Sequence, residues 1–230
     1  MDKYLHTTYS GTFPDPETAG EDGLLAMGGD LEPSTLLKAY SQGIFPWYSD
    51  ETPVLWWSPD PRMVLFPDRL KISKSLSQSI RNRGYRVLLD NDFPSVIRRC
   101  ARVFRTDQDG TWITREMEKA YTRLHFEGYA HSAETYLDNR LVGGLYGVSL
   151  GAIFFGESMF HEERDASKVA LFHLLQQLKE WDFDLIDVQQ STTHMRSLGA
   201  EDIPRKEFLK ILRRSLRKTT VRGNWGGGRK

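Results

Sequence analysis

The class of fold is indicated most clearly by residues 130–160, which read AHSAETYLDNRLVGGLYGVSLGAIFFGESMF. Its apolar runs are joined by turn-forming links, the first of which is Asp138-Asn139, and they cover residues 130–137, 140–148 and 151–159. Strand-like runs joined by such short links predict an antiparallel meander. This meander is expected to form the centre of a β-sheet.

The segments on either side of the meander alternate between strand-like and helix-like patterns. Leucines at i, i+3, i+4 and i+7 follow Asp165, a predicted N-cap, and indicate a helix whose apolar stripe packs on the sheet. Further strands are expected at residues 63–66, 85–89 and 183–188, and further helices at 93–104, 115–127 and 205–217. The pattern predicts an α+β protein with a mixed sheet flanked by helices, although pattern alone does not single out one family.

The first 60 or so residues differ in composition, because they contain many glycines and prolines, which interrupt regular secondary structure. One helix is expected there, beginning at Glu32-Pro33-Ser34 and stopped by Gly43. We therefore expect a small N-terminal domain at residues 1–61 and a larger catalytic domain at residues 62–230. The glycine-rich end from Gly226 is expected to be a loose tail.

Composition limits the possible partners and compartments. Lys+Arg and Asp+Glu both number 31, so any attraction to a polyanion has to come from local patches. Cys100 is the only cysteine, which excludes an internal disulfide and suits a reducing compartment. No uncharged run approaches the ~20 residues that span a bilayer, and no apolar leader is visible. A cytoplasmic monomer without a membrane partner is expected.

Three polar residues interrupt apolar strands. Glu157 lies in a strand that is otherwise apolar and aromatic, and a buried carboxylate is costly unless it has a partner. The alternative is an edge-strand glutamate that faces solvent or pairs with an arginine. Asp187 and Gln189 end another apolar strand, on the same face by alternation, at a place where ligands commonly bind. The alternative there is that Asp187 only caps a backbone amide.

Basic and aromatic residues indicate a nucleic-acid partner. One face of the last helix carries Lys206, Lys210, Arg213 and Arg217, a spacing that predicts contacts with a phosphate backbone. A second, less specific basic stretch contains Lys71, Lys74, Arg81, Arg83 and Arg86. Tryptophans in loops can stack on bases, although packing is the alternative for at least half of Trp47, Trp56, Trp57 and Trp112.

Several other kinds of site are excluded by their missing motifs. His161-Glu162-Glu163 lacks the second histidine of a zinc helix, and one cysteine cannot form a thiolate cluster, so no metal is expected. No phosphate-binding Gly-x-x-x-x-Gly-Lys loop occurs, and no serine-nucleophile elbow is expected. Cys100 is interpreted as packing, and Gly143-Gly144 as a strand bulge or a close approach of backbones.

Seven motifs occur in the order and spacing of the leucyl/phenylalanyl-tRNA-protein transferase family, which the chain resembles from about residue 13 to residue 208. They are GLLAMGGDL (23–31), GIFPW (43–47), LWWSPDPR (55–62), GTWIT (110–114), GESMF (156–160), ASK (166–168) and SLGA (197–200). Seven motifs in register make a chance resemblance very improbable.

The resemblance implies the fold of the acetyl-CoA-dependent N-acetyltransferases, used without coenzyme A or any other cofactor. It implies Leu or Phe on tRNA as donor, proteins beginning with Arg or Lys as acceptors, and products marked for degradation through the N-end rule. A dry apolar pocket discriminates against an amino acid with a side chain of similar size by only about 1–3 kcal/mol per methylene, so some transfer of Met is expected.

The resemblance also implies roles for individual residues. Trp47 and Trp112 should contact the terminal adenosine of the tRNA. The polar site should consist of Glu157, Asp187 and Gln189, and the pocket for the donor side chain of Leu145, Phe154, Leu171 and Leu174. The family often has Met and Phe where Leu145 and Leu174 stand, and His161-Glu162 replaces its usual Ser-Arg.

An aminoacyl ester is already activated, so positioning is the main task of such an enzyme. In our hypothesis Asp187 orients Gln189, whose side-chain oxygen accepts a hydrogen bond from the attacking amine, while Glu157 holds polar or cationic groups. One alternative is a coenzyme-A-dependent N-acetyltransferase, but its pyrophosphate loop has no match here. The other is a non-catalytic tRNA-binding module, which would leave Glu157 and Asp187 unexplained.

Overall fold

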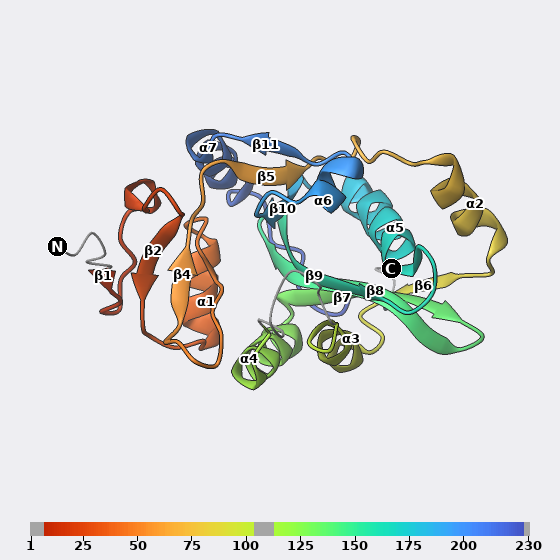
Figure 1. Ribbon diagram of the computed structural model, residues 1–230, viewed down its shortest axis with the longest axis horizontal. Helices are drawn as coiled ribbons and strands as arrows, with labels where there is room; N and C mark the ends of the chain where they lie inside the picture. The colour runs from red at the N-terminus through yellow and green to blue at the C-terminus, as the bar shows by residue number, and fades with distance from the viewer. Residues whose placement is uncertain (1–6, 104–112, 228–230) are drawn as a thin grey trace.

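The computed structural model describes residues 7–103 and 113–227, which form two sheets with helices around them (Figure 1). The smaller sheet has four strands in the order β1-β2-β4-β3. The larger has seven strands in the order β11-β5-β10-β9-β8-β7-β6. The fold class is α+β, with a mixed sheet flanked by helices.

The smaller sheet packs beside one helix near the N-terminus. Its strands are β1 (Thr7–Thr8), β2 (Leu24–Met27), β3 (Phe45–Pro46) and β4 (Leu55–Trp57), with a 3-10 turn, η1, at Pro16–Thr18. The predicted helix is present as α1 (Pro33–Tyr40), with proline in its first turn, and Gly43 follows it at φ 77°. The sheet itself was not predicted, because strands this short carry no readable alternation.

The predicted meander is confirmed as three antiparallel strands at the centre of the larger sheet. These are β7 (Ala130–Leu137), β8 (Arg140–Leu150) and β9 (Ile153–His161), so the third runs two residues further than expected. The outer strands are β5 (Arg62–Leu65), β6 (Arg86–Leu89), β10 (Leu185–Gln189) and β11 (Glu201–Ile203). Among the described strands of this sheet only β9 and β10 pair in parallel, with Asp187 opposite Phe155.

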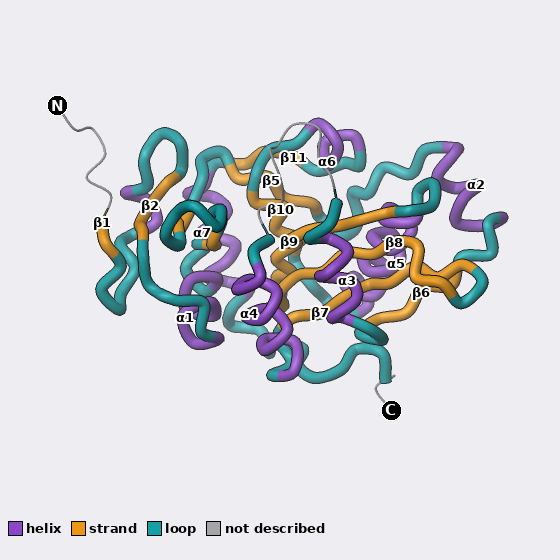
Figure 2. The backbone as a smooth tube through the Cα atoms, turned by 60° about the horizontal axis from the view of Figure 1, so that its bottom comes forward, coloured by secondary structure: helices purple, strands orange, loops and turns teal. Residues whose placement is uncertain are grey.

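Helices cover both faces of the larger sheet. α3 (Phe93–Cys100) and α4 (Arg115–Phe126) lie on one face and α5 (Ala166–Glu180) on the other, and Figure 2 turns the first face forward. Gly143 lets α5 approach closely, since a Cβ there would lie 2.5 Å from the Cβ of Ala166. The remaining helices are α2 (Lys74–Asn82), α6 (Thr193–Ser197) and α7 (Arg205–Ser215).

Several predictions about helices and the tail need correction, among them the end of α7, which lies at Ser215 and not at residue 217. α3 ends at Cys100, short of the predicted residue 104, and α2 was missed because it buries only Leu76 and Ser79. Asp165 occupies the N-cap position of α5 but does not cap a backbone N–H. The tail is held at its start, because the N–H groups of Gly226 and Gly227 both donate to Asn224 Oδ1.

A buried ion pair ties β5 to β10. Arg62 donates from Nε to Asp187 Oδ1 at 2.8 Å and from Nη2 to Oδ2 at 2.6 Å, and both side chains are fully buried. The guanidinium carbon lies 4.8 Å from the ring centre of Phe45 and 4.6 Å from that of Phe208. A two-pronged contact of this kind fixes orientation as well as distance. Arg62 therefore links the smaller sheet, α7 and the end of β10.

Replacing Arg62 by methionine should lower the free energy of unfolding by about 3–5 kcal/mol, because Asp187 would remain buried without its cation. Urea denaturation measures the change. Arg69→Met is the matched control, since Arg69 forms an exposed pair with Glu201, and such a pair contributes at most about 1 kcal/mol. Equal small effects of the two substitutions would show that the buried pair does not stabilise the fold.

Candidate active site

Two bulges lie where the parallel pairing of β9 and β10 stops. On β9, Glu157 is an extra residue between Ser158, which faces Tyr146, and Gly156, which faces Gly147. On β10, the register shifts across Val188, and the next residue, Gln189, has φ 71°. Bulges turn side chains away from simple alternation. As a result the side chains of Glu157 and Gln189 meet, with Gln189 Nε2 donating to Glu157 Oε1 at 2.8 Å.

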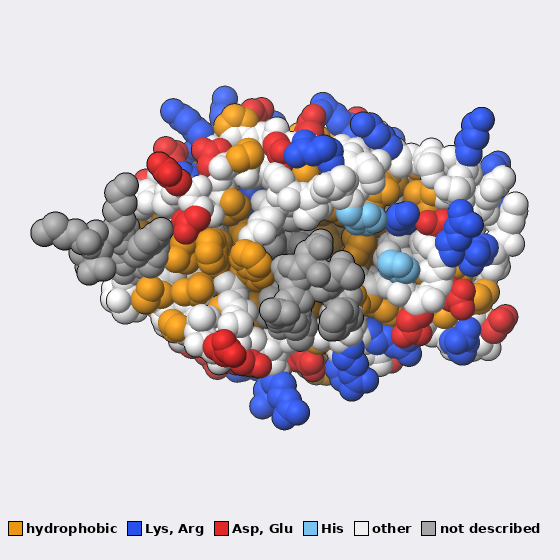
Figure 3. Space-filling model, viewed as in Figure 1, with side chains coloured by type: hydrophobic (Ala, Val, Ile, Leu, Met, Phe, Trp, Pro, Cys, Tyr) orange, Lys and Arg blue, Asp and Glu red, His pale blue; other side chains and the backbone are white. Residues whose placement is uncertain are grey.

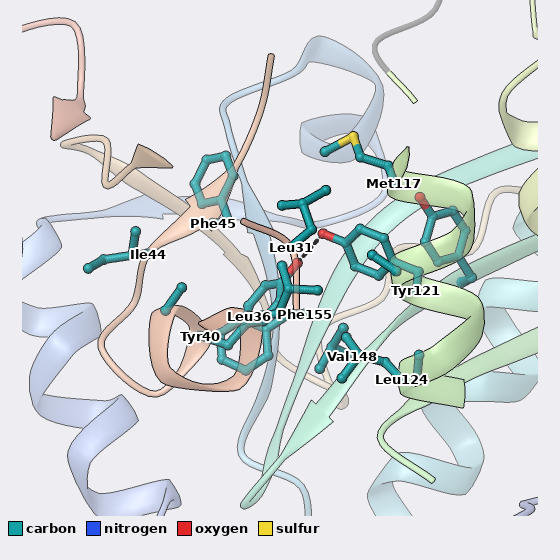
Figure 4. Packing of buried hydrophobic residues seen from close by; sticks show 14 of the residues in the cluster. Leu31, Leu36, Tyr40, Ile44, Phe45, Met117, Tyr121, Leu124, Val148 and Phe155 are labelled. Carbon is teal, nitrogen blue, oxygen red and sulfur yellow. Dashed lines mark hydrogen bonds between the residues drawn. The ribbon is translucent and has the colours of Figure 1, made fainter. Parts of the chain in front are cut away.

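Two tyrosines complete the surroundings of the Glu157 carboxyl. Tyr40 of α1 donates to Oε1 at 2.7 Å, and Tyr121 of α4 donates to Oε2 at 3.1 Å. The two hydroxyl oxygens are themselves 2.5 Å apart, as the dashed line in Figure 4 shows. Glu157 is 8% exposed. The site is therefore assembled from β9, β10, α4 and the helix of the N-terminal part.

The three oxygen contacts among Glu157, Tyr40 and Tyr121 form a closed ring. If all three are hydrogen bonds they need three protons, and the two hydroxyls supply only two. A protonated Glu157 supplies the third. Burial raises the pKa of Glu157 from its usual 4.5 to about 7, while the donors Tyr40, Tyr121 and Gln189 oppose that rise. Near neutral pH this carboxyl therefore exchanges between its charged and neutral forms.

The tyrosine hydroxyls themselves stay protonated. Burial, followed by the charge of Glu157, raises the pKa values of Tyr40 and Tyr121 well above 10. The ring can therefore carry a proton without either phenol ionising.

Asp187 acts on Gln189 through the backbone. Its Oδ1 accepts from the N–H of Gln189 at 2.9 Å and from Arg62, and its side chain is fully buried. Asp187 therefore caps a backbone amide, as the alternative interpretation expected, and in addition pairs with Arg62. Arg62, Tyr40 and Tyr121 were not predicted as site residues. A signal for Arg62 was available, since a buried aspartate requires a cation and Arg62 begins a strand.

The four residues expected to form the donor pocket lie together between β8, β9 and α5. Leu145, Phe154, Leu171 and Leu174 belong to one apolar cluster, and each is at most 4% exposed. The cluster lies on the α5 face of the sheet, whereas Tyr40 and Tyr121 belong to the core on the opposite side. Their use as a pocket stays a prediction.

The tryptophans divide into packed and partly exposed ones. Trp56 is fully buried, and its Nε1 donates to Gly28 O. Trp47 is half-buried beside Trp57, with ring centres 5.5 Å apart. Trp112 lies outside the described residues. Of the two tryptophans predicted to contact the terminal adenosine, Trp47 is therefore the one that lies within the described residues.

The two basic groups lie at opposite ends of the larger sheet. Lys206, Lys210, Arg213 and Arg217 are exposed on and just after α7, while Lys71, Lys74, Arg81 and Arg83 are exposed on α2 and its flanks (Figure 1). Beside α7 a groove of about 560 Å³ is lined by Lys206, Lys210 and Arg214, together with Pro204, Glu207 and Ile211. Figure 3 shows Lys and Arg side chains along the upper margin, on the right and along the lower margin of the view, with acidic side chains among them. The structure does not bring the two groups together.

Within 7–103 and 113–227 no three histidine, cysteine or carboxylate side chains are grouped so that they could hold a metal ion. Over the same ranges, none of the helices has the length and apolar character needed to cross a bilayer.

The larger sheet is mixed, its parallel pair ends at bulges that carry polar side chains, and helices cover both of its faces. The family follows from two matches, "Leucyl/phenylalanyl-tRNA protein transferase" over residues 64–213 and the N-terminal domain of the same name over residues 29–60. The chain belongs to the leucyl/phenylalanyl-tRNA-protein transferase family, and it is an aminoacyltransferase.

Two similar proteins carry the name of this family, and one solved structure is given for comparison of the fold. A protein of that name from an Anaeromyxobacter species is 56% identical over 93% of this chain and 91% of its own length. One from Syntrophus aciditrophicus is 56% identical over 93% of this chain and 89% of its own length. Among solved structures, a GCN5-related N-acetyltransferase from Kribbella flavida aligns with a TM-score of 0.38 and 11% identity, covering 74% of this chain and 60% of its own.

The raised pKa of Glu157 predicts a pH-dependent stability. The folded protein binds this proton more tightly than the unfolded chain, so the contribution is present below pH 4.5 and is lost as pH rises through about 7. The loss corresponds to about 3 kcal/mol. Between pH 4.5 and 8, the free energy of unfolding of Glu157→Gln should therefore rise relative to wild type by that order.

Chemical denaturation at several pH values measures this difference. Glu127→Gln removes an exposed carboxyl from the end of α4 and serves as the control, with no comparable trend expected. A difference between Glu157→Gln and wild type that stays constant over this pH range would contradict the raised pKa.

Proposed function

We propose that the protein moves Leu or Phe, and less well Met, from aminoacyl-tRNA to the α-amino group of proteins that begin with Arg or Lys. The new peptide bond would mark those proteins for degradation through the N-end rule. The observation that carries the proposal is the contact between Glu157 and Gln189 at the end of the parallel strands. The names of the relatives support the donor and the class of acceptor.

In this proposal the donor is held by its two ends. The apolar cluster around Phe154 takes the Leu or Phe side chain, and Trp47 and Trp112 contact the terminal adenosine. The four side chains predicted to line the donor pocket are closely packed, so entry of a donor side chain requires them to shift. Holding ester and amine together can supply up to about 7–11 kcal/mol of the barrier. No cofactor is needed for that task.

The attacking amine is steered by Gln189. The amide nitrogen of Gln189 is engaged with Glu157, whereas no hydrogen bond within the described residues uses its Oε1. In the proposal, that oxygen accepts a hydrogen bond from the attacking amine. The hydrogen bond orients the amine so that the lone pair of its nitrogen points at the ester carbonyl. Asp187 and Arg62 are positioning residues, because they hold the backbone N–H of Gln189 in place.

Glu157 accepts the proton that the attacking nitrogen loses. The C–N bond forms as the C–O bond of the ester breaks, the ionised carboxylate of Glu157 takes a proton from the nitrogen, and the resulting carboxylic acid gives a proton to the departing ribose oxygen. A base works best when its pKa lies near the working pH, and about 7 meets that condition. Tyr40 and Tyr121 stabilise either charge state by hydrogen bonds.

The direct test uses labelled Leu-tRNA and two peptides that begin with Arg and differ only in N-terminal acetylation. We expect label on the free peptide alone. Transfer to neither peptide, or to both, would contradict the proposed acceptor. Calorimetry with acetyl-CoA separates the coenzyme-A-dependent alternative, for which binding would be observed.

Gln189→Ala should lower kcat by about 10²-fold or more, because the amine would lose its hydrogen-bond acceptor in the transition state. The Kd for Leu-tRNA should stay within about threefold of wild type, since that interaction is not with the donor. Gln190→Ala is the matched control, an adjacent half-buried glutamine that makes no side-chain contact to Glu157 within the described residues. Wild-type turnover in Gln189→Ala would remove Gln189 from the mechanism.

A double substitution of Lys206 and Lys210 by alanine should weaken tRNA binding and reduce the slope of log Kd against log salt by about one for each phosphate that the protein no longer binds. Filter binding at several salt concentrations measures both quantities. The same substitutions at Lys71 and Lys74 test the basic group near α2. A salt slope unchanged by the α7 pair would exclude that helix from the tRNA interface.

A further inference from the structure

A tryptophan near the C-terminus is inserted into the apolar cluster that the proposed function assigns to the donor side chain. Trp225 is 7% exposed and belongs to the same cluster as Leu145, Phe154, Leu171 and Leu174. It lies beyond residue 213, where the family match ends. Its presence in the cluster is therefore a property of this chain that the matched segment does not include.

Asp90 and His131 hold Trp225 in one place. The indole stacks on the His131 ring at 3.7 Å between centres and 6° between planes. Asp90 Oδ2 accepts from the backbone N–H of Trp225 at 2.8 Å and lies 2.8 Å from His131 Nδ1, while the indole Nε1 donates to Val221 O at 3.1 Å. A ring fixed by stacking and hydrogen bonds behaves as a rigid wall.

Of the four predicted pocket residues, Phe154 is the aromatic one, and its ring contacts Trp225. The two ring centres are 6.0 Å apart with planes inclined at 42°. The other aromatic neighbours of the indole, Trp181 and Phe183, lie at 5.0 and 6.2 Å. Trp225 thus lies directly behind one wall of the cluster, where protein interiors leave little empty volume.

We propose that Trp225 sets the size of the donor side chain that the protein accepts, by fixing the position of Phe154. Trp225 is a positioning residue, because it acts on the donor through the Phe154 ring. The inference rests on the proposed function, since it requires that the donor side chain enter this cluster.

A smaller residue at position 225 should shift specificity toward larger donors. Removing the indole leaves space behind Phe154, so its ring can retreat and deepen the pocket. For Trp225→Leu, we expect the ratio of kcat/KM for Phe-tRNA to that for Leu-tRNA to rise roughly tenfold, the lower end of the selectivity carried by a single methylene. Trp225→Phe should give a smaller rise in the same direction.

The experiment measures kcat/KM for both donors in wild type, Trp225→Leu, Trp225→Phe and Leu198→Ala. Leu198 is buried in the same cluster, next to α6, and its loss reports general loosening. A merely structural role of Trp225 would lower both rates and leave the ratio unchanged, which would overturn the inference. If Trp225→Leu does not fold, the ratio in Trp225→Phe decides.

Failure of the inference and failure of the proposed function are distinguishable. A wild-type protein that transfers neither Leu nor Phe contradicts the proposed function. A wild-type protein that transfers both, with variants at position 225 that keep its donor ratio, contradicts only the role of Trp225. A shift in the ratio that also appears in Leu198→Ala would equally overturn it.

Discussion

The buried contact between Arg62 and Asp187 fixes the geometry on which the proposed site depends. It joins β5 to the end of β10, where Asp187 also accepts a hydrogen bond from the N–H of Gln189. That residue has a left-handed backbone at φ 71°, which directs its side chain toward Glu157. An isolated charge in this interior would be very costly. The ion pair thus positions an uncharged amide where the chemistry is proposed to occur.

Glu157 is also buried, but unlike Asp187 it has no cationic partner among the described residues. Its described partners are two phenols and an amide, so its carboxyl can gain or lose a proton at modest cost near neutral pH. One of the phenols, Tyr40, comes from α1, and the same core contains Leu36 of α1 and Phe155 of β9. The N-terminal part of the chain therefore supplies a wall of the site.

The sequence predicted what depends on local patterns and missed what depends on contacts between distant segments. Alternation and tight turns identified the meander, and apolar surroundings singled out Glu157 and Asp187. Tyr40 and Tyr121 lie 81 residues apart, and no local pattern indicates that their hydroxyls meet. The bulge at Val188 broke the alternation from which the direction of Gln189 was inferred. Trp225, which directly precedes the predicted tail, was not singled out, because its stacking partner, His131, lies in the distant strand β7.

The pH dependence of kcat/KM tests most directly whether Glu157 accepts the proton of the amine. The acceptor should be an arginine peptide whose α-amine is made less basic by an electron-withdrawing neighbour, with a pKa below about 5 instead of the usual ~7.7 to 8.0. The amine is then neutral throughout, and only a group of the enzyme can produce a limb. We predict that kcat/KM rises with pH through about 7, the pKa of Glu157. A flat profile between pH 6 and 9 would contradict this role.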